Sequence, residues 1–392
     1  MVDGSDSPSN SNNSSNRESH YEPFEHVAAT FYQTGLYNFP KVELHCHLDG
    51  CFRLSSVIKL AKKRSIELPT YDIVKLRNYC CLDADEDSSL ALFLKKMAVF
   101  VSVYQGSREA IRELTLEALE DKAKQGIVYI ELRFCPQLLA SAPEHPKDMN
   151  PCIAEEHPDQ LTPSEVMDTV TEAIEEAKTL FPVIKARLIL CCIAPMPEIS
   201  EDVARLAVKY KSKGVVGIDI AGEEDIEDTP AFRPHIRAFQ YAKENGLHRT
   251  AHAGEAGSAS SVIEAKRLLS AERIGHGYHI SRDPDVYKKI KTDQTHLECC
   301  PISSYRTGAV RVKEQHPIIQ FARDKINCSL STDDPGVMLT TLLDDYKLVA
   351  DFGVSEKTIK IMNLNAAQSS FLPEDEKKEL VSMLKQHYGP LN

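Results

Sequence analysis

The sequence predicts an α/β fold, a (β/α)8 TIM barrel with additional helices and a disordered N-terminal tail. Short apolar runs alternate with longer helical patterns roughly eight times, as buried parallel strands joined by helices do. Polar residues capable of chemistry stand at the ends of several of these runs. A barrel brings the carboxyl ends of all its strands to one face, where side chains far apart in the sequence meet.

Eight segments are predicted to be the strands of this barrel. Each is short, mostly apolar and bounded by turn residues. They are Lys41–His45, Ile127–Phe134, Ala186–Cys192, Val215–Ile220, His248–His252, Arg273–His276, His296–Cys299 and Cys328–Thr332.

Longer patterns between these strands predict helices, among them Ser107–Gln125 and Pro163–Thr179. The second helix is expected to begin with Thr162 as its N-cap and Pro163 at its first helical position. A doubly wound sheet would show the same alternation of strands and helices. Such a sheet would need a Gly-rich phosphate loop near its start, and neither G-x-G-x-x-G nor G-x-x-x-x-G-K-[ST] occurs, so the barrel is favoured.

Two segments differ in composition from the rest of the chain. Residues 1–20 are rich in Ser and Asn and bury too little apolar area to fold, so they are predicted to be a disordered tail. Residues 21–392 are predicted to form a single barrel domain. Within this domain, residues 141–163 are rich in Pro, His and acidic residues and predict a long loop.

Charge and cysteine content limit the possible partners. The chain of 392 residues has a formal net charge of −12, which argues against broad nucleic-acid binding. Its 11 cysteines include no C-x-x-C motif, and an odd number fits a disulfide framework poorly, so reduced thiols are expected. No secretory signal and no apolar run of roughly 20 residues is visible, so we expect a cytoplasmic protein without a membrane partner.

His45 and His47 at the first predicted strand are candidates for metal ligands. Residues two apart on a strand point to the same side, so the two imidazoles can hold one ion. An isolated H-x-H pair is as often an ordinary core or surface pair. His252 at the fifth strand and Asp333 after the eighth add a third imidazole and a carboxylate, which makes a set suited to zinc. Water bound to such an ion becomes acidic enough to form a nucleophile near neutral pH.

Candidates for proton transfer lie beside these ligands. Gly254 lets the chain turn after His252, so the carboxyl group of Glu255 can return near the ion and donate or accept a proton. Taken alone, the tetrapeptide H-A-G-E is more typical of a solvated loop glutamate. His276 has a glycine on each side, which allows close approach, and this imidazole can orient or deprotonate a bound water.

Two more strand ends offer contacts to a ligand. Adjacent carboxylates repel unless a metal or a shared proton neutralises one, so Asp333 can bind the ion while Asp334 faces a substrate nitrogen. The alternative for Asp334 is an N-cap before Pro335. Gly222 follows the fourth strand, and its missing Cβ permits a flat ligand to reach the backbone.

Five motifs resemble those of the adenosine deaminase family and occur in that family's order: KVELHCHLDG, HRTAHAGE, RIGHGYH, ECCPISSYRTG and STDDP. The resemblance extends from about Phe39 to the C-terminal region. It implies an amidohydrolase barrel with one zinc ion per chain. The P-C-x-x-C motif of the other class of zinc deaminases, which has a different fold, is absent from the sequence.

The resemblance implies a role for each residue singled out above. The zinc ligands would be His45, His47, His252 and Asp333. The catalytic residues would be Glu255, which would protonate the purine N1, His276, which would help to deprotonate the zinc-bound water, and Asp333. The substrate contacts would be His47, Asp49 at the ribose 5′-hydroxyl, Gly222 at N3 and Asp334 at N7. Glu298 and Ser303 would lie behind the catalytic histidine and support the site.

The implied reaction is hydrolytic deamination of adenosine and 2′-deoxyadenosine to inosine and 2′-deoxyinosine with release of ammonia, a step of purine salvage. The expected partner is a small purine nucleoside, and the chain is expected to be a monomer. The segment Leu90–Met97 resembles the apolar helix that gates the pocket, whereas core packing is the alternative for its apolar stripe.

Two alternatives to this function stay open. One is deamination of a related 6-aminopurine, such as adenine or an N6-substituted purine. Asp49 favours a nucleoside instead, because a carboxylate there would repel a 5′-phosphate. The other is a non-catalytic, growth-factor-like relative, which should carry a signal peptide and disulfides.

Overall fold

A computed structural model describes residues 37–82, 89–144, 160–222 and 226–391. The predicted tail at residues 1–20 lies outside the described residues, as do residues 145–159 of the predicted loop. The division of the chain into a tail and a single domain over residues 21–392 therefore stays a prediction.

Eight parallel strands form one sheet in the order in which they occur in the chain. They are β1 (Lys41–His47), β2 (Ile127–Phe134), β3 (Lys185–Ile193), β4 (Val215–Ala221), β5 (His248–Ala253), β6 (Arg273–His276), β7 (His296–Cys299) and β8 (Cys328–Leu330).

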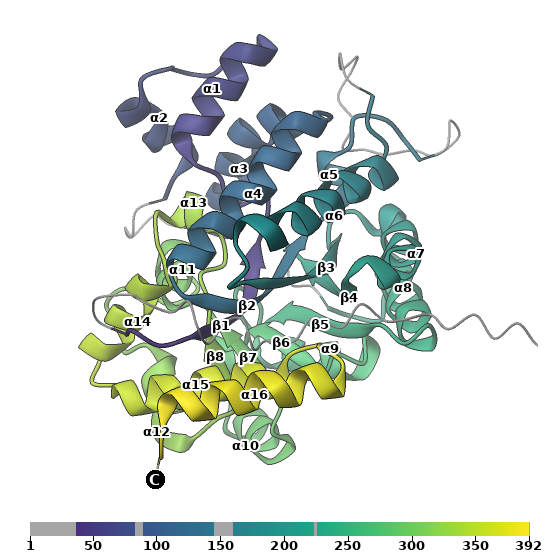
Figure 1. Cartoon of the computed structure of the whole chain (residues 1–392). Coiled ribbons are helices and arrows are strands. Elements are labelled where there is room, and N and C mark those ends of the chain that lie inside the picture. Colours follow the sequence, from purple (N-terminus) through teal and green to yellow (C-terminus); the bar gives the residue numbers. More distant parts are fainter. Residues whose placement is uncertain (1–36, 83–88, 145–159, 223–225, 392) are drawn as a thin grey trace, which may run out of the picture.

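The sheet closes between β1 and the segment that follows β8. Cys46 forms a parallel bridge with Asp333. The backbone N–H of His47 donates to the Asp333 carbonyl (2.8 Å), and the N–H of Asp333 donates to the His45 carbonyl (3.1 Å). Figure 1 shows the strands at the centre of the molecule with helices around them. The predicted (β/α)8 barrel is confirmed.

The helices connect the strands and cover the barrel. They are α1 (Leu54–Arg64), α2 (Ile73–Cys80), α3 (Leu90–Tyr104), α4 (Arg108–Lys124), α5 (Pro136–Leu139), α6 (Pro163–Leu180), α7 (Ser200–Lys209), α8 (Arg233–Glu244), α9 (Ala259–Leu268), α10 (Pro284–Asp293), α11 (Pro301–Arg306), α12 (Pro317–Asp324), α13 (Pro335–Met338), α14 (Leu342–Asp351), α15 (Glu356–Ser369) and α16 (Glu374–Tyr388). Short 3₁₀ turns lie at Pro197–Ile199, Lys211–Lys213 and Tyr278–Arg282.

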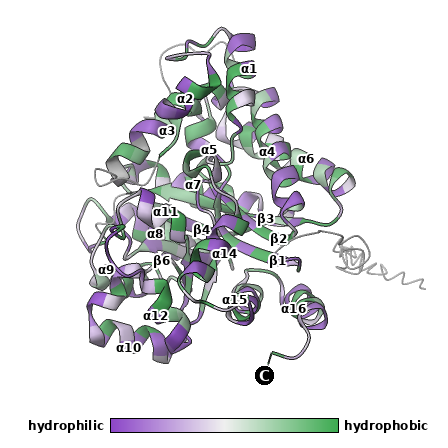
Figure 2. Ribbon diagram, turned by 90° about the vertical axis from the view of Figure 1, so that its left-hand side faces the viewer, coloured by the Kyte–Doolittle hydropathy of each residue, from purple (hydrophilic) through white to green (hydrophobic). Residues whose placement is uncertain are grey.

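The strands are buried because helices cover one side of each and the barrel interior lies on the other. All eight residues of β2 are buried, which explains why its sequence is nearly continuous in apolar residues. Figure 2 shows hydrophobic residues along β2 and β3 and a mixture of colours on β1 and the surrounding helices. No helix among the described residues combines the length and apolar composition that crossing a membrane requires.

Five strands differ in their boundaries from the predicted ones. β3 also includes Lys185 and Ile193, β4 includes Ala221 and β5 includes Ala253. The larger differences are in β1 and β8. β1 continues through His47, because His47 still pairs with Arg133 of β2. β8 ends at Leu330 rather than Thr332. Beyond it, Asp333 adopts a left-handed backbone conformation with φ of 64°, which takes the chain out of the sheet.

The predicted start of α6 is confirmed in detail. Thr162 is the N-cap and Pro163 the first helical residue. The Thr162 hydroxyl accepts from the N–H of Glu165 (3.3 Å), and the Glu165 carboxylate accepts from the N–H of Thr162 (2.9 Å). This reciprocal pair satisfies two backbone donors that the first turn would otherwise leave without a partner.

Replacing Thr162→Ala should therefore lower the free energy of unfolding by about 1 kcal/mol. The measurement is urea unfolding followed by circular dichroism, with Thr179→Ala as the control at the exposed, opposite end of α6. Alanine favours a helix, so the control should keep or slightly gain stability. Equal losses in the two variants would contradict the capping role.

Candidate active site

Four side chains with metal-binding atoms converge at the carboxyl ends of the strands. His45 and His47 come from β1, His252 from β5, and Asp333 follows β8. His252 Nε2 lies 3.1 Å from His45 Nε2 and 3.3 Å from His47 Nε2. Asp333 Oδ1 lies 3.2 Å from His45 Nε2 and 3.4 Å from His47 Nε2. All four donor atoms lie within 4.8 Å of one another.

A second layer of hydrogen bonds fixes the orientation of two of these imidazoles. His45 Nδ1 lies 2.8 Å from Glu298 Oε2, and His252 Nδ1 lies 3.0 Å from Asp219 Oδ2. Burial alone would raise the pKa of Glu298, but Arg133 and Arg273 hold it well below its usual range. Glu298 is thus an ionised acceptor, and the Nδ1 atom of His45 donates to it.

The electronic state of the two histidines fits a bound cation. His45 Nδ1 donates to Glu298, and His252 Nδ1 donates to the Ile220 carbonyl with Asp219 Oδ2 also 3.0 Å away. Each Nε2 of a neutral ring therefore carries a lone pair, and the two lone pairs face each other. Such an arrangement requires a proton or a cation between the nitrogens. Burial opposes protonation of His252, but Asp219 outweighs that effect and raises its pKa to about 9, so a proton can occupy this place when no metal does.

Arg133 connects the two supporting carboxylates. Its guanidinium donates to Asp219 Oδ2 (2.9 Å) and to Glu298 Oε2 (2.6 Å), and all three side chains are fully buried. Sequence reasoning missed both Asp219 and Arg133. The available signal was the charged residues inside the apolar runs, one in VVGIDI and two in IVYIELRF, since a buried charge needs a partner.

Glu298 and Ser303 support the site, as expected. Glu298 pairs in the sheet with Gly275, next to His276, and its side chain bonds to His45. The Ser303 hydroxyl donates to Asp333 Oδ2 (2.7 Å). The sequence did not specify either of these two side-chain partners.

Glu255 and His276 form the part of the site that can transfer protons. Glu255 Oε2 lies 3.5 Å from His276 Nε2, and His276 Nε2 lies 3.8 Å from Asp333 Oδ2. Burial, followed by the charge of Asp333, raises the pKa of Glu255 to about 7. The carboxyl group is therefore suited to hold a proton near neutral pH and to release it to a bound ligand. The alternative of a solvated loop glutamate is excluded, because Glu255 is buried.

Asp334 and Asp49 are buried carboxyl groups whose Oδ1 atoms have no hydrogen-bond partner among the described residues. Burial and the neighbouring acids raise the pKa of Asp334 well above its usual range, and burial raises that of Asp49 to about 7. Asp334 occupies the N-cap position of α13 but accepts no capping hydrogen bond, so the N-cap alternative does not account for it. Such atoms are available to a bound ligand.

Glycines shape the space around these acids. A Cβ on Gly50 would lie 2.1 Å from Asp334 Oδ1, so only glycine leaves room for that carboxyl group. Gly222 directly follows β4 with φ of 105°, a conformation that favours glycine. Its neighbour Ile220 carries the carbonyl that accepts from His252 Nδ1 (3.1 Å), which places the end of β4 beside the histidines.

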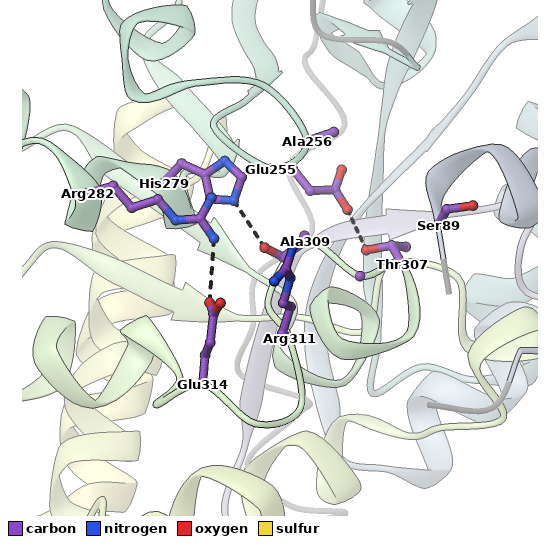
Figure 3. Close-up of a pocket in the computed structure, with 10 residues that line it drawn as sticks. Ser89, Glu255, Ala256, His279, Arg282, Thr307, Ala309, Arg311 and Glu314 are labelled. Atoms are coloured by element: carbon purple, nitrogen blue, oxygen red, sulfur yellow. Dashed lines mark hydrogen bonds and ion pairs between the residues drawn. The ribbon is translucent and has the colours of Figure 1, made fainter. Parts of the chain in front are cut away.

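A cavity of about 510 Å³ extends from Glu255 to the surface. Figure 3 shows Glu255 and Thr307 on one of its walls, with Arg282, Arg311 and Glu314 further out. Ser89, the N-cap of α3, also lines this cavity, so the start of the predicted gating helix borders the site. Gating by α3 stays a prediction. His279, which also lines the cavity, hydrogen-bonds the carbonyls of Gly257 and Ala309.

A closed parallel barrel with three imidazoles, a carboxylate and a buried glutamic acid at its strand ends defines an amidohydrolase-type barrel with a potential metal site. The profile of the adenosine deaminase family matches residues 40–387. The chain belongs to the adenosine deaminase family, whose members are hydrolases that act on amidine C–N bonds, and it is an enzyme of that family.

Individual relatives agree with this assignment. The chain is 43% identical to the adenosine deaminase of Mus musculus over 357 residues, covering 91% of this chain and 99% of that protein. It is 38% identical to the adenosine deaminase of Clostridium botulinum over 355 residues, covering 89% and 98%. Among solved structures, the adenine deaminase of Arthrobacter aurescens superposes with a TM-score of 0.75 at 26% identity, covering 88% of this chain and 98% of that one.

The hydrogen bond from His252 to Asp219 predicts an effect on metal affinity. Asp219→Asn should weaken binding of a divalent metal about 10- to 100-fold, because the amide neither orients His252 nor raises its basicity as the carboxylate does. The measurement is competition with a chelating dye. Asp168→Asn is the matched control, since Asp168 pairs with Lys213 on the outer helices. Unchanged affinity in Asp219→Asn would contradict this role.

Proposed function

We propose that this enzyme uses one zinc ion to deaminate adenosine and 2′-deoxyadenosine hydrolytically, releasing ammonia and forming inosine and 2′-deoxyinosine. The observation that carries the proposal is the cluster of three imidazoles and one carboxylate beside a buried, protonatable Glu255. Membership of the adenosine deaminase family supports the reaction and the substrate.

In this proposal His45, His47, His252 and Asp333 hold the zinc ion. Three nitrogen ligands and one oxygen ligand are a set that zinc accepts, and the opposed Nε2 lone pairs of His45 and His252 call for a cation. When bound, zinc supplies a water made acidic enough to act as a nucleophile near neutral pH.

Glu255 and His276 move protons in the proposed reaction. Glu255 donates its proton to N1 of the purine, which keeps negative charge from building up on the ring as C6 is attacked. His276, with its Nε2 3.8 Å from Asp333 Oδ2, accepts a proton from the attacking water and then stabilises the charge that develops at C6. The proton that His276 accepted then passes to the amino group, the C6–N bond breaks and ammonia leaves. The new C6 hydroxyl returns a proton to Glu255, and inosine keeps the proton on N1.

The remaining residues hold the substrate. Asp334, protonated because its pKa is raised, donates to N7, and the backbone of Gly222 reaches N3. His47 and Asp49 lie on the ribose side, with Asp49 Oδ1 4.0 Å from His47 Nδ1. Asp49 binds the 5′-hydroxyl, and a 5′-phosphate would meet an unfavourable carboxylate at this position.

We also propose that the enzyme works in the cytoplasm and as a monomer. The ten cysteines among the described residues are all buried and free, as expected for a protein in the reducing cytoplasm. We propose a monomer as the working form of the enzyme, since the site described above is complete without a residue from a second chain. Its partner is a small purine nucleoside.

Glu255→Gln should bind the same amount of zinc as the wild type but lose about 10²- to 10⁴-fold in kcat, because the amide cannot give a proton to N1. Turnover is measured from the loss of adenosine and the formation of inosine, and metal by elemental analysis. Glu264→Gln on α9 is the matched control and should keep full activity.

Full activity of Glu255→Gln with normal zinc content would mean that another group protonates the ring. Loss of zinc together with activity would instead show that Glu255 belongs to the metal site rather than to the acid chemistry.

Asp49→Asn should lower kcat/KM for adenosine about 10-fold, because the carboxyl group that binds the 5′-hydroxyl is replaced by an amide with different hydrogen-bonding groups, and should leave any turnover of free adenine unchanged. Competition between adenosine and adenine measures this ratio. Asp285→Asn, on the exposed side of α10, is the control. A wild-type enzyme that prefers adenine would overturn the nucleoside assignment in favour of the adenine alternative.

A further inference from the structure

We infer that Thr307 is a positioning residue for the acid of the reaction: its hydroxyl holds one oxygen of Glu255 and thereby directs the proton of the carboxyl group to the other. This inference rests on the proposed function of Glu255 and extends it to a residue for which the sequence motifs suggested no role.

The geometry of the pair is well defined. Thr307 Oγ1 donates to Glu255 Oε1 (3.1 Å), and both side chains are buried. The other oxygen, Oε2, is the one that lies 3.5 Å from His276 Nε2. Figure 3 shows Glu255 and Thr307 pointing toward each other at the wall of the cavity. The hydroxyl therefore lies on the side of Glu255 away from His276.

The helix that carries Thr307 also supports the proposed metal site. Thr307 is the C-cap residue of α11, and its N–H donates to the carbonyl of Ser303 (2.7 Å). Residues four apart share one face of a helix, and Ser303 uses this face to donate to Asp333 Oδ2 (2.7 Å). One short helix thus fixes a proposed zinc ligand and the proposed acid relative to each other.

The hydrogen bond determines which oxygen of Glu255 carries its proton. An oxygen that accepts from Thr307 is the carbonyl oxygen of the acid, so the proton lies on Oε2. In the step, the Oε2–H bond breaks, an N1–H bond forms, and the electron pair stays on Glu255. As the carboxylate forms, the bond from Thr307 becomes charge-assisted and stronger, so it stabilises the transition state more than the ground state.

The first test removes the hydroxyl without changing the shape of the side chain. Thr307→Val should lower kcat for adenosine about 10- to 100-fold, since it removes one hydrogen bond to a developing charge. Binding of 1-deazaadenosine, which has no N1 to receive a proton, should stay unchanged. Thr307→Ser should restore most of kcat. Thr292→Val, which removes a hydroxyl on the exposed α10, is the matched control. If the valine variant does not fold, Thr307→Ala provides the same comparison.

The second test asks whether Thr307 acts through Glu255. In the Glu255→Gln background, adding Thr307→Val should lower the residual kcat by less than about 3-fold, because the acid that the hydroxyl positions is already absent. An equal loss in both backgrounds overturns the inference, since a purely structural role would act in both. Wild-type kcat in Thr307→Val overturns it as well.

The same measurements distinguish the role of Thr307 from the proposed deamination of adenosine. A wild-type enzyme that releases no ammonia from adenosine overturns the proposed function and the role of Thr307 together. An active wild type whose Glu255→Gln variant is impaired, while Thr307→Val is not, overturns the role of Thr307 alone.

Discussion

Arg133 binds two carboxylates deep inside the barrel, Asp219 and Glu298, and each of these carboxylates in turn binds an imidazole at the barrel mouth. The geometry of the site depends on this group of charges. Removing one member of a buried ion pair leaves an uncompensated charge and typically costs about 3–5 kcal/mol. The charge of Arg133 helps to keep Asp219 and Glu298 ionised. These two carboxylates orient His252 and His45 so that their Nε2 atoms face each other.

The closed barrel sets the distances between the side chains of the site, and the neighbouring charges set which of its acids are protonated. Parallel strands that close between β1 and the segment after β8 bring His45 next to Asp333, 288 positions further along the chain. Within that frame, each acid has a different state because its neighbours differ. Arginines keep Glu298 ionised, whereas burial beside other acids favours the protonated forms of Glu255 and Asp334. Separate environments for similar groups allow one site to contain both acceptors and donors of protons.

Much of this arrangement follows from local sequence. Thr162 and Pro163 mark the start of α6 because capping depends only on neighbouring residues. The alternation of apolar runs and helices predicts the barrel, and the positions of histidines at strand ends predict the cluster.

Other parts of the site depend on the register between distant strands. Asp219 and Glu298 meet Arg133 across 86 and 165 positions, and no local pattern specifies those contacts. For the same reason, the bond between Glu298 and His45 was not specified by the sequence. The left-handed conformation at Asp333, which decides where Asp334 points, is likewise set by closure of the barrel rather than by its own residue type.

The central claim is that four side chains of one barrel hold a zinc ion that serves the deamination of adenosine. It is tested most directly by titrating metal-free protein with zinc while following the products formed from adenosine. Activity should rise until one zinc is bound per chain and then stay constant, with inosine and ammonia formed in equal amounts. Zinc bound at one per chain without formation of inosine, or formation of inosine that does not depend on zinc, would contradict it.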